Sequence, residues 1–208
     1  ELNKKIKSHQ EWLKDINEGE RLVLNGYNLS SLNLVGVNLK YAEFSGSDLS
    51  YTSFFNSDLK YADLGNANLF SADLENVNLE VAYLHNSNLS YANLDNATLI
   101  NSNMSDSNLS HTIFRRANLL RANLSNCKLD NTKLSQANTN QVYGLDIYSI
   151  DNIGTFNGKV TYIPSLDRVF AGCWKGSLDE FLNRGLYMNV DNEQQIKLIK
   201  QAYNFFKV

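Results

Sequence analysis

One spacing constrains this chain more than any other feature: a large apolar residue recurs at every fifth position from about residue 22 to residue 140. In the stretch YADLGNANLFSADLENVNLE, residues 61–80, the recurring residues are Leu64, Leu69, Leu74 and Leu79. An α-helix repeats about every 3.6 residues and a β-strand about every 2, so a strict period of five fits neither. The backbone must turn a corner in each repeat and return over itself, which predicts a solenoid.

Each repeat has further regular positions around this large residue, which we call the centre. The residue two before the centre is usually small, as at Ala62, Ala72 and Ala92, and the residue just before it is usually Asn or Asp. The small residue is expected to point inward, because a narrow tube has no room for a second large side chain. The residue after the centre, such as Ser90, is expected to point outward. Only the last centre, Thr139, is polar.

This pattern, A(D/N)Lxx in its commonest form, resembles the pentapeptide-repeat family over about 119 of the 208 residues. The resemblance implies a mainly β fold, a right-handed quadrilateral parallel β-helix in which four pentapeptides make one square coil. About 24 repeats then give about six coils. Residues twenty apart are expected to lie in columns, and one column contains only leucines: Leu29, Leu49, Leu69, Leu89, Leu109 and Leu129.

The first coil departs from the rule for small inward residues, because these positions hold Leu22, Tyr27, Leu32 and Val37. We interpret it as an end coil that packs against something larger. The preceding segment, residues 1–21, is predicted to be a capping helix. Its apolar face would consist of residues at spacings of four and three, namely Leu2, Ile6, His9, Leu13 and Ile16. A cap is expected because an open coil exposes unpaired backbone groups.

Residues 141–208 are predicted to form a small α+β unit after the β-helix domain of residues 22–140. VTYIPSLDRVFAGCW indicates two short strands around a turn, and SLDEFLNRG a helix with a capping box of Ser177 and Glu180 that ends at Gly185. A last helix is predicted from about Asp191, with Gln194 completing its own capping box. The HQEWL and GCWKGSLDEF segments resemble the flanks of uncharacterised phage and bacterial pentapeptide proteins.

Several classes of chemistry find no support in the sequence. No segment has the roughly 18 consecutive apolar residues of a membrane helix, and the charged first twenty residues do not resemble a signal peptide. Cys127 and Cys173 are too few for a disulfide framework, which favours a reducing, cytoplasmic location. The three histidines and two cysteines lack metal-ligand spacing, and Cys173 has no histidine nearby in sequence. No metal, cofactor or catalytic residue is therefore predicted.

The charges and aromatic residues give the candidate site. Residues 43–80 contain seven acids and one base, whereas residues 106–133 contain five bases and two acids. The acidic half also has aromatic residues at positions expected to face outward, a combination that favours a protein-binding face. The predicted binding residues are Tyr41, Tyr51, Phe55, Tyr61, Phe70, Asp48, Asp58, Asp63 and Asp73. A secondary basic patch is predicted at Arg115, Arg116 and Arg121.

The favoured hypothesis is a non-enzymatic protein-binding scaffold or inhibitor that acts through the solenoid surface and the C-terminal unit. The alternative is a DNA mimic that binds a topoisomerase or nuclease, since some pentapeptide proteins protect DNA gyrase by resembling a duplex. The net charge of −3 is weak for a mimic, and the basic patch departs from that pattern. An enzyme in the C-terminal unit is a third hypothesis. We expect a protein partner, no direct nucleic-acid or membrane binding, and either a monomer or a dimer.

Overall fold

The computed structural model describes residues 1–145, 148–151, 159–171 and 174–207. The chain divides into two compact units. The first consists of Glu1–Thr132 with Asn138–Gly144, and the second of Lys133–Ala137 with Leu145–Val208. The predicted cap and most of the predicted β-helix thus belong to one unit. Cys173 and part of the GCWKG segment lie outside the described residues.

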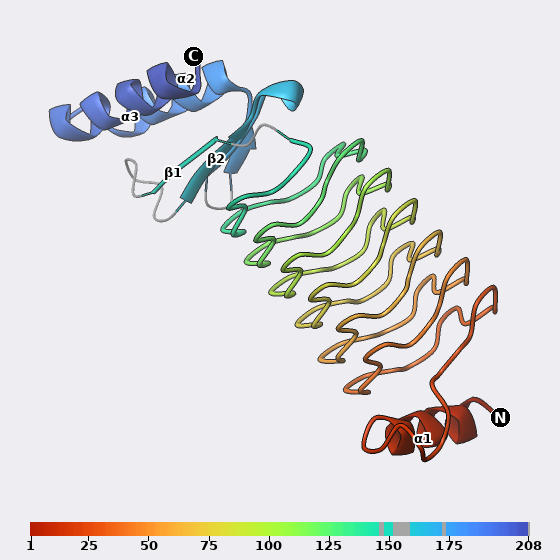
Figure 1. The fold of residues 1–208 in the computed structure, drawn as a ribbon. Helices are drawn as coiled ribbons and strands as arrows, with labels where there is room; N and C mark the ends of the chain where they lie inside the picture. Colours follow the sequence, from red (N-terminus) through yellow and green to blue (C-terminus); the bar gives the residue numbers. More distant parts are fainter. Residues whose placement is uncertain (146–147, 152–158, 172–173, 208) are drawn as a thin grey trace. The chain divides into compact units, whose positions relative to one another are not determined.

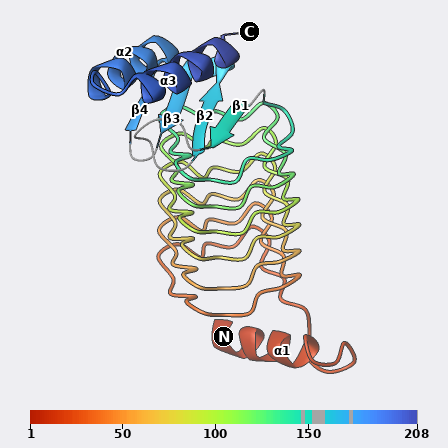
Figure 2. The same ribbon diagram turned by 90° about the vertical axis from the view of Figure 1, so that its left-hand side faces the viewer.

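The first unit is a stack of coils joined by single parallel bridges between residues twenty apart, from Val23 with Glu43 to Asn123 with Tyr143. Four such columns of bridges run along the stack, at positions five residues apart. The coils lie one on another along the whole series (Figure 2). Each side of a coil contributes one bridged residue rather than a long strand, so the corners are frequent and the tube is narrow.

The interior of the coils follows the predicted register. The centres are buried almost without exception, and so are the small residues two before them; Leu89 and Ala92, for example, are both 0% exposed. Ser90 differs from the prediction, because it is only 6% exposed. Its hydroxyl donates a hydrogen bond to Asn88 Oδ1 at 2.7 Å. An outward register position is therefore not always open to solvent.

The corners explain two further regularities. The second residue after each centre has a positive φ, as at Asn56 (57°) and Asn66 (58°), where Asn and Gly are the residues least strained. The Asn or Asp before the centre accepts a hydrogen bond from the N–H two residues on. Phe70 N donates to Asn68 Oδ1 at 3.3 Å, and Asn88 Nδ2 donates to the same oxygen at 3.0 Å. These residues hold each turn and join successive coils.

The helix α1 (Leu2–Trp12) lies against the first coil (Figure 2). His9 is its buried residue, and Leu22 N donates to His9 Nδ1 at 3.1 Å. Gln10 Nε2 donates to the carbonyl oxygen of Asn38 at 2.7 Å. The predicted apolar face is too long, because the helix ends at Trp12 and Ile16 is 73% exposed.

The large residues predicted to pack at the end coil differ in their burial. Leu22 is 2% exposed, whereas Tyr27 is 50% exposed and lies under Lys5, with Nζ 5.2 Å from the ring centroid. Leu32 and Val37 are half-buried. The interpretation of Tyr27 as a packed inward residue is therefore wrong, because its ring remains at the surface, where it meets a lysine.

The second unit contains a four-stranded antiparallel sheet with the strand order β1-β2-β3-β4 and two helices. Its elements are β1 (Tyr148–Asp151), β2 (Lys159–Ile163), a 3-10 turn η1 (Pro164–Leu166), β3 (Arg168–Ala171), β4 (Trp174–Gly176), α2 (Leu178–Met188) and α3 (Glu193–Phe206). Figure 1 shows α2 and α3 side by side along the sheet. Their shared core consists of Val160, Tyr162, Val169, Ala171, Leu178, Phe181, Ile199, Ala202 and Phe206.

The helix boundaries of this unit confirm one prediction and correct two. The capping box of Ser177 and Glu180 is present at the start of α2. Gly185 does not end α2, which continues to Met188; a Cβ at Gly185 would lie 2.8 Å from Ile199 Cγ2, so this glycine allows α2 and α3 to pack closely. The helix α3 is capped by Asn192, not Asp191, with Gln195 N donating to the Asn192 side chain. No helix among the described residues is both long and apolar enough to cross a membrane.

Candidate functional site

Two of the predicted aromatic residues form a stack near the first coil. The rings of Tyr41 and Tyr61 are parallel within 10°, with centroids 4.9 Å apart, as their spacing of twenty residues predicts. Trp12 of α1 adds an edge-on contact to Tyr41 at 6.2 Å. We call Trp12, Tyr41 and Tyr61 the Tyr41 stack. Tyr41 is 42% exposed and Tyr61 is 37% exposed, so this stack is partly covered.

A second and longer row of rings lies at another corner of the coils. The ring centroids of Tyr51 and Phe70 are 5.5 Å apart, and those of Phe70 and Tyr91 are 5.6 Å apart. Tyr91 stacks on His111 with a centroid distance of 4.4 Å, and the two rings are within 4° of parallel. We call these four residues the Tyr91 ladder. Tyr51 is 60% exposed and Tyr91 is 53% exposed, whereas Phe70 and His111 are half-buried. The ladder therefore presents aromatic edges and faces from four successive coils.

The Tyr91 ladder includes two residues that the sequence analysis missed, Tyr91 and His111. Their spacing of twenty residues, continued from Tyr51 by a step of forty, was the signal that could have found them. Phe55 belongs to neither group: it is half-buried and makes no ring contact with the other described residues. The structure thus divides the predicted aromatic face into two separate rows.

The predicted acids do not lie together on one side. Asp48, Asp58, Asp63 and Asp73 belong to four different columns of bridged residues. Their carboxylates also hold the turns, since each accepts from the backbone N–H two residues on: Ser50 to Asp48 at 3.0 Å, Lys60 to Asp58 at 3.1 Å, Gly65 to Asp63 at 2.9 Å and Glu75 to Asp73 at 3.3 Å. The first role of these four carboxylates is therefore to stabilise the turns.

Further contacts restrict three of these acids, including Asp73, which accepts from the Ser53 hydroxyl at 3.2 Å. Hydrogen bonds from the Ser50 hydroxyl and N–H hold the pKa of Asp48 below its usual value, and Asn68 Nδ2 adds a third at 3.0 Å. Asp58 accepts from Asn78 Nδ2 at 3.0 Å and pairs with Lys40 Nζ at 3.1 Å. The negative charge here is distributed around the coils and partly neutralised.

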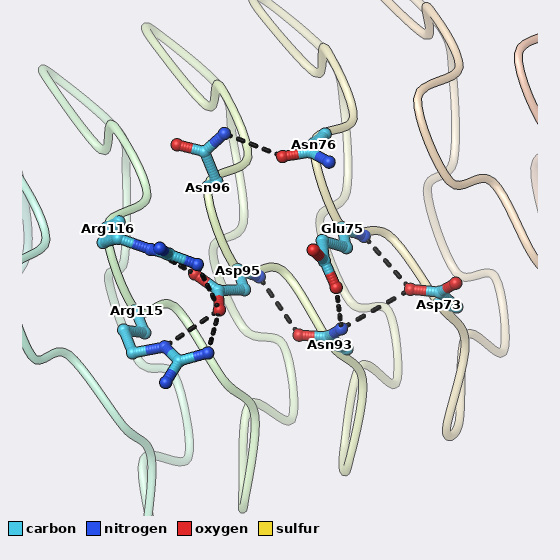
Figure 3. A network of polar contacts seen from close by, with 8 residues as sticks. All are labelled: Asp73, Glu75, Asn76, Asn93, Asp95, Asn96, Arg115 and Arg116. Carbon is cyan, nitrogen blue, oxygen red and sulfur yellow. Dashed lines mark hydrogen bonds and ion pairs between the residues drawn. The ribbon is translucent and has the colours of Figure 1, made fainter.

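The predicted basic patch also separates into two places. Arg115 and Arg116 both bind Asp95, whose residue is only 3% exposed (Figure 3). Arg116 Nε lies 3.0 Å from Asp95 Oδ1, and Arg115 Nε lies 2.9 Å from Asp95 Oδ2. Arg121 lies in a different column, where its Nε donates to Gln141 Oε1 at 2.6 Å. The three arginines thus form hydrogen bonds between successive coils. Asp95, the partner of Arg115 and Arg116, was not identified from the sequence.

Burial raises the pKa of Asp95, but the two guanidiniums lower it more, so that it lies below the usual range of an aspartate. Beside Asp95 the polar network continues through Asn93 to the preceding coil (Figure 3). Asp95 N donates to Asn93 Oδ1 at 3.2 Å, and Asn93 Nδ2 donates to Glu75 at 3.2 Å. This is a structural network with half-exposed guanidiniums at its surface.

Cys127 and any cluster of His, Cys, Asp and Glu side chains are further candidate reactive groups, as far as the structure describes them. Within the ranges that the structure describes, no three His, Cys, Asp or Glu side chains are grouped as metal ligands would be. Burial raises the pKa of Cys127 to about 11, and its Sγ donates to the Met104 carbonyl oxygen at 2.9 Å. At neutral pH this thiol is therefore protonated and a poor nucleophile.

The bridges at twenty-residue spacing, the buried centres and the left-handed corners define a parallel β-helix repeat protein. A model of pentapeptide repeats, in eight copies, matches residues 23–54, 47–80, 62–101, 78–116 and 102–138. These ranges include more than half of the chain, which belongs to the pentapeptide-repeat family. The resemblance seen in the sequence is confirmed, and the solenoid is a right-handed β-helix.

Solved structures of other pentapeptide-repeat proteins are similar to this chain. Rfr23 from the cyanobacterium Cyanothece 51142 is 27% identical, with a TM-score of 0.47 over 62% of this chain and 98% of its own. HetL, which is involved in heterocyst differentiation regulation in Nostoc, is 22% identical, with a TM-score of 0.33 over 59% of this chain and 78% of its own. QnrB1, a plasmid-mediated fluoroquinolone resistance protein, is 19% identical, with a TM-score of 0.47 over 60% and 69%. No curated protein matches the chain.

Proposed function

We propose that this protein is a non-enzymatic scaffold or inhibitor that binds a protein partner through the Tyr91 ladder. The observation that carries the proposal is the exposure of Tyr51 and Tyr91, at 60% and 53%, within a row of rings already held in contact with one another. Tyrosine is enriched among the residues that dominate binding energy at protein interfaces. Four aromatic side chains in successive coils form an anchor about 14 Å long, at the usual spacing of paired strands.

The stacking of these rings favours binding because it reduces the entropy lost on association. Tyr91 lies between Phe70 and His111, and its neighbours restrict its side-chain rotamers before any partner arrives. Preorganised side chains retain more of their interaction energy when they bind. The Tyr41 stack has the same character but less exposed area, and Trp12 covers one side of it.

The acids are proposed to act at longer range than contact. Residues 43–80 have seven acids against one base, and the partner is therefore expected to present a basic surface. Because the carboxylates of residues such as Asp48 and Asp58 also hold turns and meet asparagine or lysine side chains, their contribution is steering rather than direct ion pairing. Binding should weaken moderately as salt is added.

A second exposed surface supports a contribution from the C-terminal unit. Tyr187 is 85% exposed, Met188 is 47% exposed and Val190 is 73% exposed, all at the end of α2 or just after it. Three neighbouring apolar side chains in water are typical of a contact surface. This unit would add to binding independently of the ladder.

The DNA-mimic alternative has less support from the geometry. A mimic must present rows of unshared negative charge at phosphate-like spacing, whereas the four predicted acids occupy four separate columns and accept hydrogen bonds within their own turns. Asp95 is bound by two arginines. A mimic would lose its target when duplex DNA is added, with a steep dependence on salt. A partner held by aromatic contacts would remain bound.

The test replaces the two exposed tyrosines of the ladder together, Tyr51→Ser with Tyr91→Ser. The matched control is Tyr83→Ser, since Tyr83 is 49% exposed but lies outside both aromatic rows. Immobilised protein of each kind would be incubated with lysate, and retained proteins quantified by mass spectrometry and then by titration of the isolated partner. We expect the double variant to bind at least about tenfold more weakly and the control to bind normally.

Two further variants test which surface of the solenoid binds the partner. Replacing Tyr41 and Tyr61 together by serine tests the Tyr41 stack, and reversing the charge of Arg115 and Arg116 tests the basic pair. If the partner binds the ladder variant normally and is lost when the arginines are reversed, the proposed surface is wrong. Displacement of the captured partner by duplex DNA would instead support mimicry.

A further inference from the structure

The first coil leaves unpaired some backbone groups whose equivalents in later coils form hydrogen bonds. In later coils, the residue before the centre typically uses both its N–H and its C=O to bind the preceding coil. Glu43 N donates to Leu22 O at 2.9 Å, and Leu24 N donates to Glu43 O at 2.8 Å. Val23 is the equivalent of Glu43 one coil earlier. No coil precedes Val23, so its N–H and C=O lack this pairing.

The helix α1 satisfies only part of this edge. Gln10 Nε2 takes over the carbonyl oxygen of Asn38, and His9 Nδ1 accepts from Leu22 N. Among the residues that the structure describes, no hydrogen-bond partner reaches the backbone N–H or C=O of Val23. Val23 is 44% exposed. It is therefore an open β-edge beside the capping helix rather than beneath it.

A groove lies at this edge. Its volume is about 500 Å³, and it is lined by Lys4, Lys5 and Ser8 of α1 and by the chain entering the first coil, Glu20, Arg21, Leu22 and Val23. Three cations face one anion there, although Arg21 also pairs with Glu43. The groove thus combines an unpaired strand edge with an excess of positive charge.

We propose that this groove binds an extended acidic segment of a partner protein, which adds to the first coil as a further strand beside Val23. The segment would donate an N–H to the Val23 carbonyl and accept from the Val23 N–H, as Glu43 does with its neighbours. Its carboxylates would lie near Lys4 and Lys5. This site is separate from the Tyr91 ladder and stands whether or not the ladder binds a partner.

The chemistry favours a peptide over a second copy of this chain. In a twofold dimer through this edge the same patch would meet itself, so Lys4, Lys5 and Arg21 would face their own copies. Like charges in that arrangement repel, whereas an acidic segment neutralises them. An exposed strand edge is also a surface that proteins usually cover or pair.

The experiment titrates the protein with a fluorescein-labelled peptide of alternating glutamate and valine residues and measures fluorescence anisotropy at low salt. A second peptide has the same sequence with methylated backbone nitrogens, which cannot donate hydrogen bonds. We expect the first peptide to bind and the methylated peptide to bind at least about tenfold more weakly. This comparison uses unaltered protein, so folding does not affect it.

Variants then test the charges. Lys4→Glu with Lys5→Glu should abolish binding, and Lys7→Glu, an exposed position of the same helix outside the groove, should leave it unchanged. Equal binding of the methylated peptide would overturn strand addition. Equal binding of a lysine–valine peptide would overturn the charge argument. Sedimentation that shows a dimer dissolved by the peptide would identify a second copy as the occupant and overturn the proposal.

Discussion

Replacing Asp95 by asparagine should lower the stability of the solenoid measurably, although the two side chains have nearly the same size and shape. The side chain of Asp95 is 5% exposed, and it is the shared acceptor of Arg115 and Arg116 from the next coil. Asparagine keeps one acceptor oxygen but places an NH₂ group against the guanidiniums. The two arginines then lose the charge that holds them between coils.

The size of the effect follows from the burial of each partner. Hydrogen bonds to a charged group contribute about 1.5–3 kcal/mol, whereas exposed ion pairs contribute about 0–1 kcal/mol. Here the carboxylate is buried but each arginine side chain is 52% exposed. Solvent therefore screens the cations, and we expect Asp95→Asn to lower the free energy of unfolding by about 1–2 kcal/mol.

The dependence on pH gives the sign of the effect. The pKa of Asp95 in the folded protein is lower than in the unfolded chain, where the pKa of an aspartate is about 3.9. Its contribution is therefore full above about pH 4 and is lost as the pH falls through the folded pKa. Urea unfolding followed by circular dichroism should show the largest difference between wild type and variant near neutral pH, and convergence in acid.

The matched control is Asp106→Asn. Asp106 is exposed and accepts one hydrogen bond from Asn126 Nδ2 at 3.0 Å, without a cation among the bonds described. Its replacement should change the stability by less than about 0.5 kcal/mol. If Asp95→Asn and Asp106→Asn have the same small effect, or if the Asp95 difference persists unchanged in acid, the two arginines do not depend on this carboxylate and the reasoning is wrong.

Three further predictions follow from the coils and the capping helix. Ala92→Leu should overpack the tube and cost about 1–3 kcal/mol in urea unfolding, whereas Ser105→Leu at a half-buried outward position should cost less; equal costs would contradict the register. Removing residues 1–20 should expose the first coil and cause association, visible in light scattering; a stable monomer would contradict the capping role. Burial holds the pKa of His9 below its usual value, so the stability contributed by the neutral imidazole is full above about pH 6.5 and is lost as the pH falls below it. The protection factors of the α1 amides, which are corrected for the intrinsic exchange rate at each pH, should therefore decrease as the pH falls from about 7 to about 5, and constant protection would count against the role of His9.

The period of five determines the β-helix from sequence because each of its positions has one physical requirement. The centre must fill the tube, the residue two before it must be small, and the Asn or Asp must accept a turn N–H. The stacking of Tyr41 on Tyr61 follows from that register alone. The contact of Tyr51 with Phe70 does not, because it joins neighbouring corner positions nineteen residues apart and depends on how far the rings reach.

Local signals outside the repeats were less reliable, since tertiary packing decides between them. Glycine is common at helix ends, which predicts that Gly185 ends the helix. It lies within α2 instead, because a side chain at this position would collide with Ile199 of α3. Asp95 looks like an ordinary outward residue in sequence. Only the position of Arg115 twenty residues later, and of Arg116 beside it, shows what it binds. The partners of such a carboxylate are found about twenty residues away in the sequence, in the next coil, and not among its sequence neighbours.

The second residue after each centre is the repeat position that is most often open to solvent. Centres and small residues are buried, and the Asn or Asp position is occupied by turn hydrogen bonds, which leaves the two residues after each centre. The second of these has a positive φ, where Asn and Gly are least strained and a bulky residue is unfavourable by about 1–2 kcal/mol. Tyr51 at 59°, Tyr91 at 63° and His111 at 62° accept that strain in one column. Tyr41 and Tyr61 have the same conformation, each with a φ of 62°, so the positive φ alone does not separate the two aromatic rows. Tyr51 and Tyr91 are more exposed than Tyr41 and Tyr61, and this exposure makes the Tyr91 ladder the surface to test first.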